Sequence, residues 1–163
     1  GVNDGVQLGS PASLELQDFT IEAWVKRANL ILATGGGDSS GDFLGWDTGG
    51  YAFGVFDDGR LDFARIGVSR VTTAALLTDT SWHHVAVTKS GTNVVFYLDG
   101  VAYPAPAYDP GFTFAASAVI GARADLSHSF WGSIDELSFY NRALSASEIQ
   151  GIYSALSAGK CAP

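Results

Sequence analysis

The stretch "WHHVAVTKSGTNVVFYLDGVAYP", residues 82–104, decides the fold, because short turn sequences interrupt three strand-like segments in it. The first interruption covers residues 90–93 and the second is the pair Asp99 and Gly100. A two-residue hairpin turn needs positive φ angles, which Asp and Gly tolerate. We therefore predict two consecutive hairpins here, which form an antiparallel meander of three strands.

The same strand pattern continues on both sides of this meander. In "FTIEAWVK", residues 19–26, apolar and polar side chains alternate, and "YAFGVFDDGRLDFARI", residues 51–66, predicts a hairpin around Asp58 and Gly59. Residues 117–122 and 132–140 complete a set of about ten short strands, the spacing of a sandwich or jelly roll. Residues 33–50 are the longest stretch without a strand pattern, and we expect a glycine-rich loop there.

One helix is predicted after the last strand. Ser145 and Glu148 have the spacing of a capping box, and Leu144 with Ile149 can form a hydrophobic staple. The apolar residues that follow fall on one helical stripe: Ile149, Ile152, Tyr153 and Leu156. We expect a short helix docked on a sheet edge and ending near Gly159. The fold class is therefore all-β, a two-sheet antiparallel jelly-roll sandwich with one short C-terminal helix.

Composition limits the partners. The 163 residues carry a formal net charge of −8, and an acidic surface repels nucleic acid and anionic membranes but suits cations. The sequence has no apolar run of about 18 residues, which predicts a soluble domain without membrane insertion. Methionine is absent even at position 1, so we expect a domain of a larger multidomain chain. Residues 1–158 form the predicted domain and residues 159–163 a tail or linker, whose lone Cys161 excludes an internal disulfide.

Five motifs carry a family resemblance: "FTIEAWVK", "WHHVAVT", "VVFYLDG", "VIGA" and "GSIDELSFYNRALSASEIQGIY". In this order they resemble the bacterial type of laminin G-like domain that is related to pentraxins, within the concanavalin A-like lectin and glucanase superfamily. The resemblance covers about residues 1–156. It implies the jelly-roll fold and a secreted or cell-surface setting, but a fold that carries lectins, glycosidases and spacers does not fix the function.

Asp135 and Glu136, side by side in "GSIDELSFY", are the first candidates for chemistry. Glycosidases of the resembled superfamily place their acids at alternate positions of one strand, so that all face one groove. Strict alternation puts Asp135 on one face with Ser133 and Leu137, and Glu136 on the other. Two acids on opposite faces cannot share a substrate, so we predict no catalytic residues and no enzyme.

A structural calcium ion is the better prediction for Asp135. Laminarinase-like relatives hold Ca²⁺ with an Asp at this position of the last strand and oxygens from the N-terminal segment, which Asn3 and Asp4 resemble. Calcium takes about six to eight oxygen ligands, several of which can be backbone carbonyls. The alternative is that Asp135 is hydrogen-bonded to a turn.

A second calcium prediction rests on the resemblance to pentraxins, which bind ligand through ions held by loops. Asp42 and Asp125 occupy corresponding places in this sequence. Arg123 stands where the family has an acid and His128 where it has an amide, so the pattern is incomplete. The alternative is that the acids within residues 38–47 are turn residues, the commoner role of Asp beside Gly.

A sugar-binding site usually has an exposed aromatic ring that stacks on the sugar, and acids or amides that hydrogen-bond to its hydroxyl groups. The ligand-binding candidates in or next to predicted loops are Trp46, Tyr51, Tyr108, Trp131 and Asp38. For each ring the alternative is packing at the rim or in the core. Trp24 and Trp82 lie inside predicted strands and are assigned to the core.

The sequence therefore predicts a non-catalytic extracellular binding module that recognises a carbohydrate or a glycosylated surface protein, with Ca²⁺ as a structural ion. The alternative is a purely structural spacer or assembly domain of a larger surface protein, with no small ligand. Clustered exposed aromatic residues would favour the lectin, whereas a flat apolar patch would favour assembly.

Overall fold

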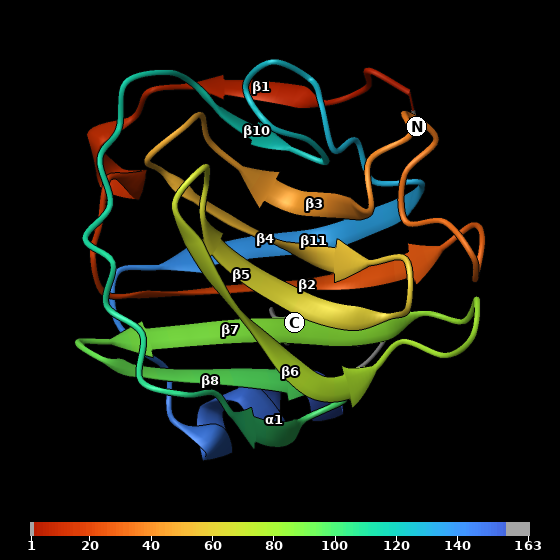
Figure 1. Ribbon diagram of the computed structural model, residues 1–163. Coiled ribbons are helices and arrows are strands. Elements are labelled where there is room, and N and C mark those ends of the chain that lie inside the picture. The colour runs from red at the N-terminus through yellow and green to blue at the C-terminus, as the bar shows by residue number, and fades with distance from the viewer. Residues whose placement is uncertain (1, 156–163) are drawn as a thin grey trace.

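The computed structural model describes residues 2–155, which form two antiparallel β-sheets packed face to face and one helix (Figure 1). The six-stranded sheet, called sheet A, has the order β1-β10-β3-β4-β5-β6. The five-stranded sheet, called sheet B, has the order β11-β2-β7-β8-β9. The predicted all-β jelly-roll sandwich is confirmed.

The chain crosses between the two sheets several times. The strands of sheet A are β1 (Val6–Gly9), β3 (Ser40–Gly45), β4 (Tyr51–Phe56), β5 (Arg60–Arg65), β6 (Ser69–Leu76) and β10 (Ala118–Ile120). The strands of sheet B are β2 (Phe19–Arg27), β7 (His83–Ser90), β8 (Asn93–Leu98), β9 (Val101–Pro104) and β11 (Gly132–Tyr140). A short 3₁₀ turn spans Ala12–Leu14, and helix α1 spans Ala146–Ala155.

The hairpins form where the turn chemistry predicts them. Strands β7, β8 and β9 pair in sequence as a meander, and Asp99 and Gly100 have φ angles of 51° and 77°. Gly59 has a φ of 91° in the turn between β4 and β5. The Asp99 and Gly100 loop is a two-residue turn with both φ angles positive, whereas the loop of residues 57–59 has three residues and needs positive φ only at Gly59, so a hairpin forms at both predicted places.

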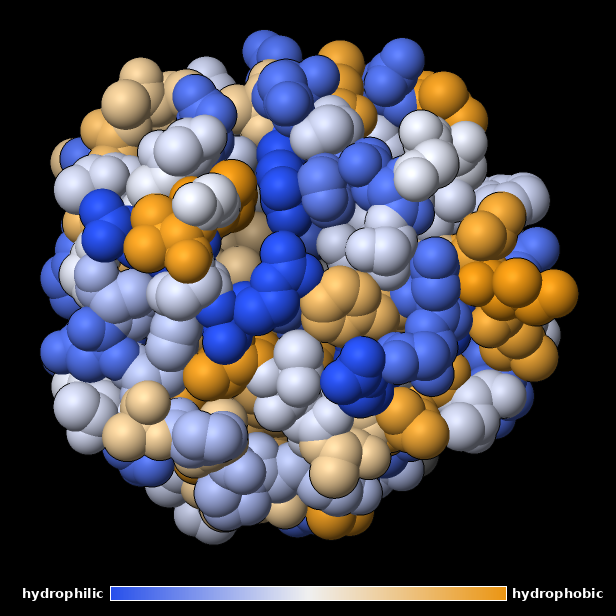
Figure 2. All heavy atoms as spheres, viewed as in Figure 1, coloured by the Kyte–Doolittle hydropathy of each residue, from blue (hydrophilic) through white to orange (hydrophobic). Residues whose placement is uncertain are grey.

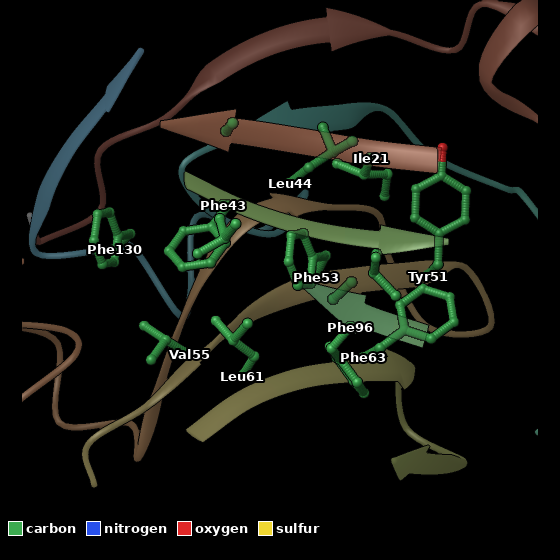
Figure 3. Close-up of a cluster of buried hydrophobic side chains, with 14 of the residues drawn as sticks. Ile21, Phe43, Leu44, Tyr51, Phe53, Val55, Leu61, Phe63, Phe96 and Phe130 are labelled. Atoms are coloured by element: carbon green, nitrogen blue, oxygen red, sulfur yellow. The ribbon is translucent and has the colours of Figure 1, made fainter. Parts of the chain in front are cut away.

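The core lies between the sheets and is largely aromatic (Figure 3). Phe53 and Phe63 of sheet A and Phe96 of sheet B are completely buried. The ring of Phe43 meets that of Phe53 edge to face with centroids 5.4 Å apart, a geometry that aromatic pairs favour. Every second residue of β4 and β5 contributes to this core, so the residues between them point to the outer face of sheet A.

Strand β3 corrects one prediction. Residues 33–50 contain the buried strand β3 in the middle of sheet A, where we expected only a loop. Its glycines are required by close backbone approach: a Cβ at Gly41 would lie 2.4 Å from the carbonyl oxygen of Ala33, and one at Gly45 would lie 2.8 Å from that of Ala122. Glycine here marks a crowded strand and not a turn.

Strand β11 departs from strict alternation. Asp135 pairs with Trp24 but Ser138 pairs with Glu22, so the strand carries one extra residue, a bulge. Glu136 has a φ of 51°, and its amide donates to Asp135 Oδ1 over 2.8 Å. The bulge brings Leu137 to the core side, opposite to its predicted position on the face of Asp135, while both acids are exposed.

Helix α1 has the predicted cap but a different docking site. The Ser145 amide donates to Glu148 Oε2 over 2.9 Å, and the Glu148 amide donates to Ser145 Oγ over 3.3 Å. Ile149 is fully buried against the outer face of sheet B, and Tyr153 stacks on Trp24. The helix therefore covers a sheet face, not an edge, and Trp24 lies beneath it outside the main core. The predicted helix residue Leu156, the tail and Cys161 lie outside the described residues.

Candidate functional site

Three of the predicted sugar-binding rings are buried. Trp46 is 1% exposed, Tyr51 0% and Tyr108 8%, so no ring face is open to a ligand. The Tyr51 hydroxyl donates to the carbonyl of Leu14, and the Tyr108 hydroxyl accepts from the amide of Arg65. For these three rings the alternative holds: they pack in the core, and the hydroxyl groups of the two tyrosines bond to the backbone of neighbouring segments.

Trp131 does lie at the surface. It is 38% exposed and lines a pocket of about 360 Å³ together with Val2, Leu32 and Gly35. Asp38 lies on the neighbouring loop, where its Oδ2 accepts from the His128 amide over 3.0 Å. Trp82, assigned to the core from the sequence, is instead 43% exposed because it precedes β7.

The connection between β10 and β11, residues 121–131, brings several predicted metal ligands to one end of the sandwich. The Asp4 amide donates to Ser129 Oγ over 3.2 Å, while the oxygen Oδ1 of Asp125 accepts from the amide and hydroxyl of Ser127. These two hydrogen bonds hold the pKa of Asp125 below its usual value. Asn3 is exposed beside Asp4 and has a φ of 56°.

The surroundings of Asp42 do not fit a calcium ion. Arg123 Nε lies 2.7 Å from Asp42 Oδ2, so a guanidinium already supplies the positive charge. Among residues 2–155, no group of three or more His, Cys, Asp or Glu side chains is arranged to hold a metal. Asp135 is exposed, so an ion there would take most of its ligands from backbone carbonyls and water. Calcium at Asp135 stays a prediction.

A polar row crosses the outer face of sheet A. Asp42 of β3 pairs with Gly54 of β4, Gly54 with Asp62 of β5, and Asp62 with Thr72 of β6. Because paired residues project to the same side of a sheet, both carboxylates flank a position that has no side chain. A Cβ at Gly54 would lie 2.7 Å from Asp42 Oδ1, so this carboxylate leans over the glycine.

The two acids in this row are buried and only partly satisfied. Asp42 and Asp62 are 0% and 1% exposed, and Oδ1 of each carboxylate has no hydrogen-bond partner. Burial raises the pKa of Asp62 from its ordinary 3.8 to about 7, against the opposing effect of Arg70. Burial also raises the pKa of Asp42, although Arg123 opposes the shift. An unpartnered carboxylate oxygen inside a protein is costly, and such sites are functional candidates.

Arginine side chains cover these acids. Arg70 Nη1 lies 3.5 Å from Asp62 Oδ2, and the guanidinium carbon of Arg70 lies 5.1 Å from the centre of the Phe56 ring. The guanidinium carbon of Arg60 lies 5.5 Å from the same ring. Figure 2 views this face and shows strongly hydrophilic side chains that cross its middle over β4 and β5, beside a hollow. We call the outer face of sheet A, with this polar row and these arginines, the candidate site.

Sequence reasoning missed Asp62 and Gly54. The available signal was an acid between two core residues in "RLDFAR", because Asp is rare inside strands. Its pairing with Asp42 through Gly54 depends on strand order, which spacing along the chain does not give.

The histidines of β7 take structural roles. His84 is fully buried, with Nε2 3.1 Å from Glu22 Oε2. The ring of His83 lies between Asp99 and Asp79, at 2.8 and 3.1 Å. These contacts tie β7 to its neighbours and to the loop before it.

Comparisons with known proteins agree with this architecture. Similar solved structures include a putative carbohydrate-binding protein from Bacteroides ovatus, with 17% identity and a TM-score of 0.65. The match covers 83% of this chain but only 40% of that protein. Domain 4 of an extracellular arabinanase from Geobacillus stearothermophilus, in complex with arabinotriose, has 22% identity and a TM-score of 0.67, with 90% of this chain and 71% of that chain covered. The CBM40 of a Ruminococcus gnavus sialidase bound to α2,3 sialyllactose has 14% identity and a TM-score of 0.67, with 94% and 99% covered.

At these identities the likenesses establish the fold and not the ligand. No curated protein matches the sequence. Within the described residues, no helix has the length and apolar character needed to cross a membrane. The profile of one protein family matches residues 1–150, and the chain therefore belongs to the concanavalin A-like lectin/glucanases superfamily.

Proposed function

We propose that this domain is a non-catalytic carbohydrate-binding module and that the candidate site on sheet A is its binding surface. One observation carries the proposal: the side chains of Arg60 and Arg70, each nearly half exposed, lie on the outer face of sheet A, above the buried acids of the polar row. Exposed hydrogen-bonding side chains on a sheet face suit a chain of sugar rings, whose hydroxyl groups need partners across a broad surface.

The structural neighbours support this function. The arabinanase domain was solved with arabinotriose and the sialidase module with α2,3 sialyllactose, so the same fold binds oligosaccharides in two other proteins. Both neighbours also belong to enzymes that act on glycans. A module of this kind belongs in a secreted or cell-surface multidomain protein, and we extend that setting to this chain.

A specific observation favours the second candidate, an assembly or spacer domain. The loop after β2 exposes Leu30, Ile31 and Leu32 by 47%, 77% and 41%, and Val2 and Trp131 lie beside it around the end pocket. Clustered exposed apolar side chains commonly mark protein contact surfaces. This apolar end is separate from the polar candidate site, so variants can distinguish the two.

The test is a glycan array probed with the domain and two variants. Thr72→Trp places a bulky ring on the polar row at a half-buried strand position, and Trp131→Ala removes the aromatic ring of the end pocket. The proposal predicts that glycan binding is lost in T72W and kept in W131A, with both variants folded by circular dichroism. Binding lost only in W131A would move the site to the end pocket, and no binding by the wild type would favour the assembly domain.

A further inference from the structure

Two arginines share one aromatic ring at the border of the candidate site. The guanidinium carbons of Arg60 and Arg70 lie 5.5 and 5.1 Å from the centre of the Phe56 ring. An aromatic face stabilises a cation and holds the flat guanidinium group in place. We call Phe56, Arg60 and Arg70 the arginine platform. Two like charges at one ring repel each other, and an anion between or beside them would relieve this repulsion.

Over the polar row, the charges that a ligand meets are those of the arginines and not those of Asp42 and Asp62. The side chains of Arg60 and Arg70 are 46% and 45% exposed, whereas those of Asp42 and Asp62 are 0% and 1% exposed. The hidden acids lie beneath the surface with Asp62 Oδ2 at 3.5 Å from Arg70, a long contact for an ion pair. On a protein with a net charge of −8, this face therefore presents a local cationic surface.

One exposed acid competes for the platform. Asp58 Oδ2 lies 2.8 Å from Arg60 Nε, and the Asp58 side chain is 53% exposed. Ion pairs between exposed side chains contribute little, because water solvates both partners and salt screens them. This pair leaves Arg60 available to another anion, and among residues 2–155 the ion pair of Arg70 is the longer one with Asp62, at 3.5 Å.

From this arrangement we infer that the ligand of the candidate site is an acidic glycan, whose sugar carboxylates bind the arginine platform. The inference rests on the proposed carbohydrate-binding function and adds the chemical class of the sugar. A guanidinium group donates two parallel hydrogen bonds to a carboxylate, and such charge-assisted pairs are stronger than bonds to neutral hydroxyl groups. The ring of Phe56 fixes the plane of the guanidinium and so the approach of the sugar.

The experiment compares two forms of one sugar chain by isothermal titration calorimetry. The probes are oligogalacturonate, which carries a carboxylate on every ring, and its methyl ester, which has the same rings without the charge. The wild-type domain is expected to bind oligogalacturonate roughly tenfold or more tightly than the ester, the effect of one charged hydrogen-bonded contact. The preference should weaken between low and high salt.

Four variants test which charged side chain binds the sugar carboxylate. Arg70→Gln removes the guanidinium and should lower the affinity for oligogalacturonate by roughly tenfold, while Arg70→Lys should recover part of it. Lys26→Gln is the matched control, because Lys26 is an exposed cation on β2 of sheet B. Asp62→Asn should strengthen the binding of oligogalacturonate, since it removes a negative charge from beneath Arg70.

Three outcomes would overturn the inference. If the ester or neutral oligosaccharides bind as tightly as oligogalacturonate, the module binds glycans without the platform, and only the acidic class is wrong. If Asp62→Asn abolishes binding while Arg70→Gln does not, the buried acid and not the arginine contacts the sugar. If no oligosaccharide on the glycan array binds at all, the proposed function fails together with the inference.

Discussion

Asp62→Asn should make the protein more stable above neutral pH and change little in acid. Burial raises the pKa of Asp62 from 3.8 to about 7, which is about 3 units, and each unit corresponds to ~1.4 kcal/mol. The charged carboxylate therefore costs the native state at most about 4 kcal/mol relative to the unfolded chain. The charged groups that act on Asp62 are Arg70, Asp42, Arg123 and Arg60, in this order of effect.

The sign follows from the raised pKa. Below about pH 4 the carboxyl is protonated in both states. Between about pH 4 and 7 it ionises in the unfolded chain but stays protonated in the folded state, so stability falls as the pH rises and the fall levels off above about 7. Urea unfolding at pH 5 and pH 8 measures this loss. The variant should be up to about 4 kcal/mol more stable than the wild type at pH 8 and should differ by much less at pH 5.

A matched control is Asp58→Asn, which changes an exposed carboxylate on the same face of the protein. The difference in free energy of unfolding between this variant and the wild type should be the same at pH 5 and at pH 8. If Asp62→Asn lowers the stability at pH 8, then Arg70 stabilises the charged carboxylate more than burial penalises it. The argument for a strained acid beneath the arginines would then be refuted.

Other predictions test single contacts. Ser145→Ala should lower the free energy of unfolding by about 1 kcal/mol, because it removes the cap that Glu148 completes, and chemical denaturation measures this. Gly54→Ala should cost about 1–3 kcal/mol in the same assay, since its Cβ would lie 2.3 Å from the carbonyl oxygen of Gly41. If calcium binds at Asp135, millimolar Ca²⁺ should raise the melting temperature of the wild type but not of Asp135→Asn, and an equal response of both would end that prediction.

The sequence predicted correctly those turns and caps that depend on only a few neighbouring residues. The Asp99 and Gly100 turn and the Ser145 and Glu148 cap each form where two residues satisfy a backbone requirement by themselves. Five ordered motifs also indicated the family that the profile match establishes. These features need no knowledge of which strands are neighbours.

Where the sequence misled, the missing information was contact between distant segments. Gly41 resembles a loop residue until the carbonyl of Ala33 is placed against it, and Trp46 looks exposed until the sandwich closes around it. The bulge at Glu136 breaks the alternation that placed Leu137 on the same face as Asp135. In each case a neighbour in space, which lies elsewhere in the chain, overrode the local pattern.

By itself, the sequence determined the sheet content, the hairpins, the helix cap and the family, because strand period and turn conformation are properties of short segments. Only the tertiary structure decided the candidate site. Asp42 and Asp62 are twenty residues apart and meet across Gly54 because β3, β4 and β5 are neighbours in sheet A. Their burial, and with it the raised pKa of Asp62, comes from side chains that the fold brings over them, since desolvation depends on the surroundings in space.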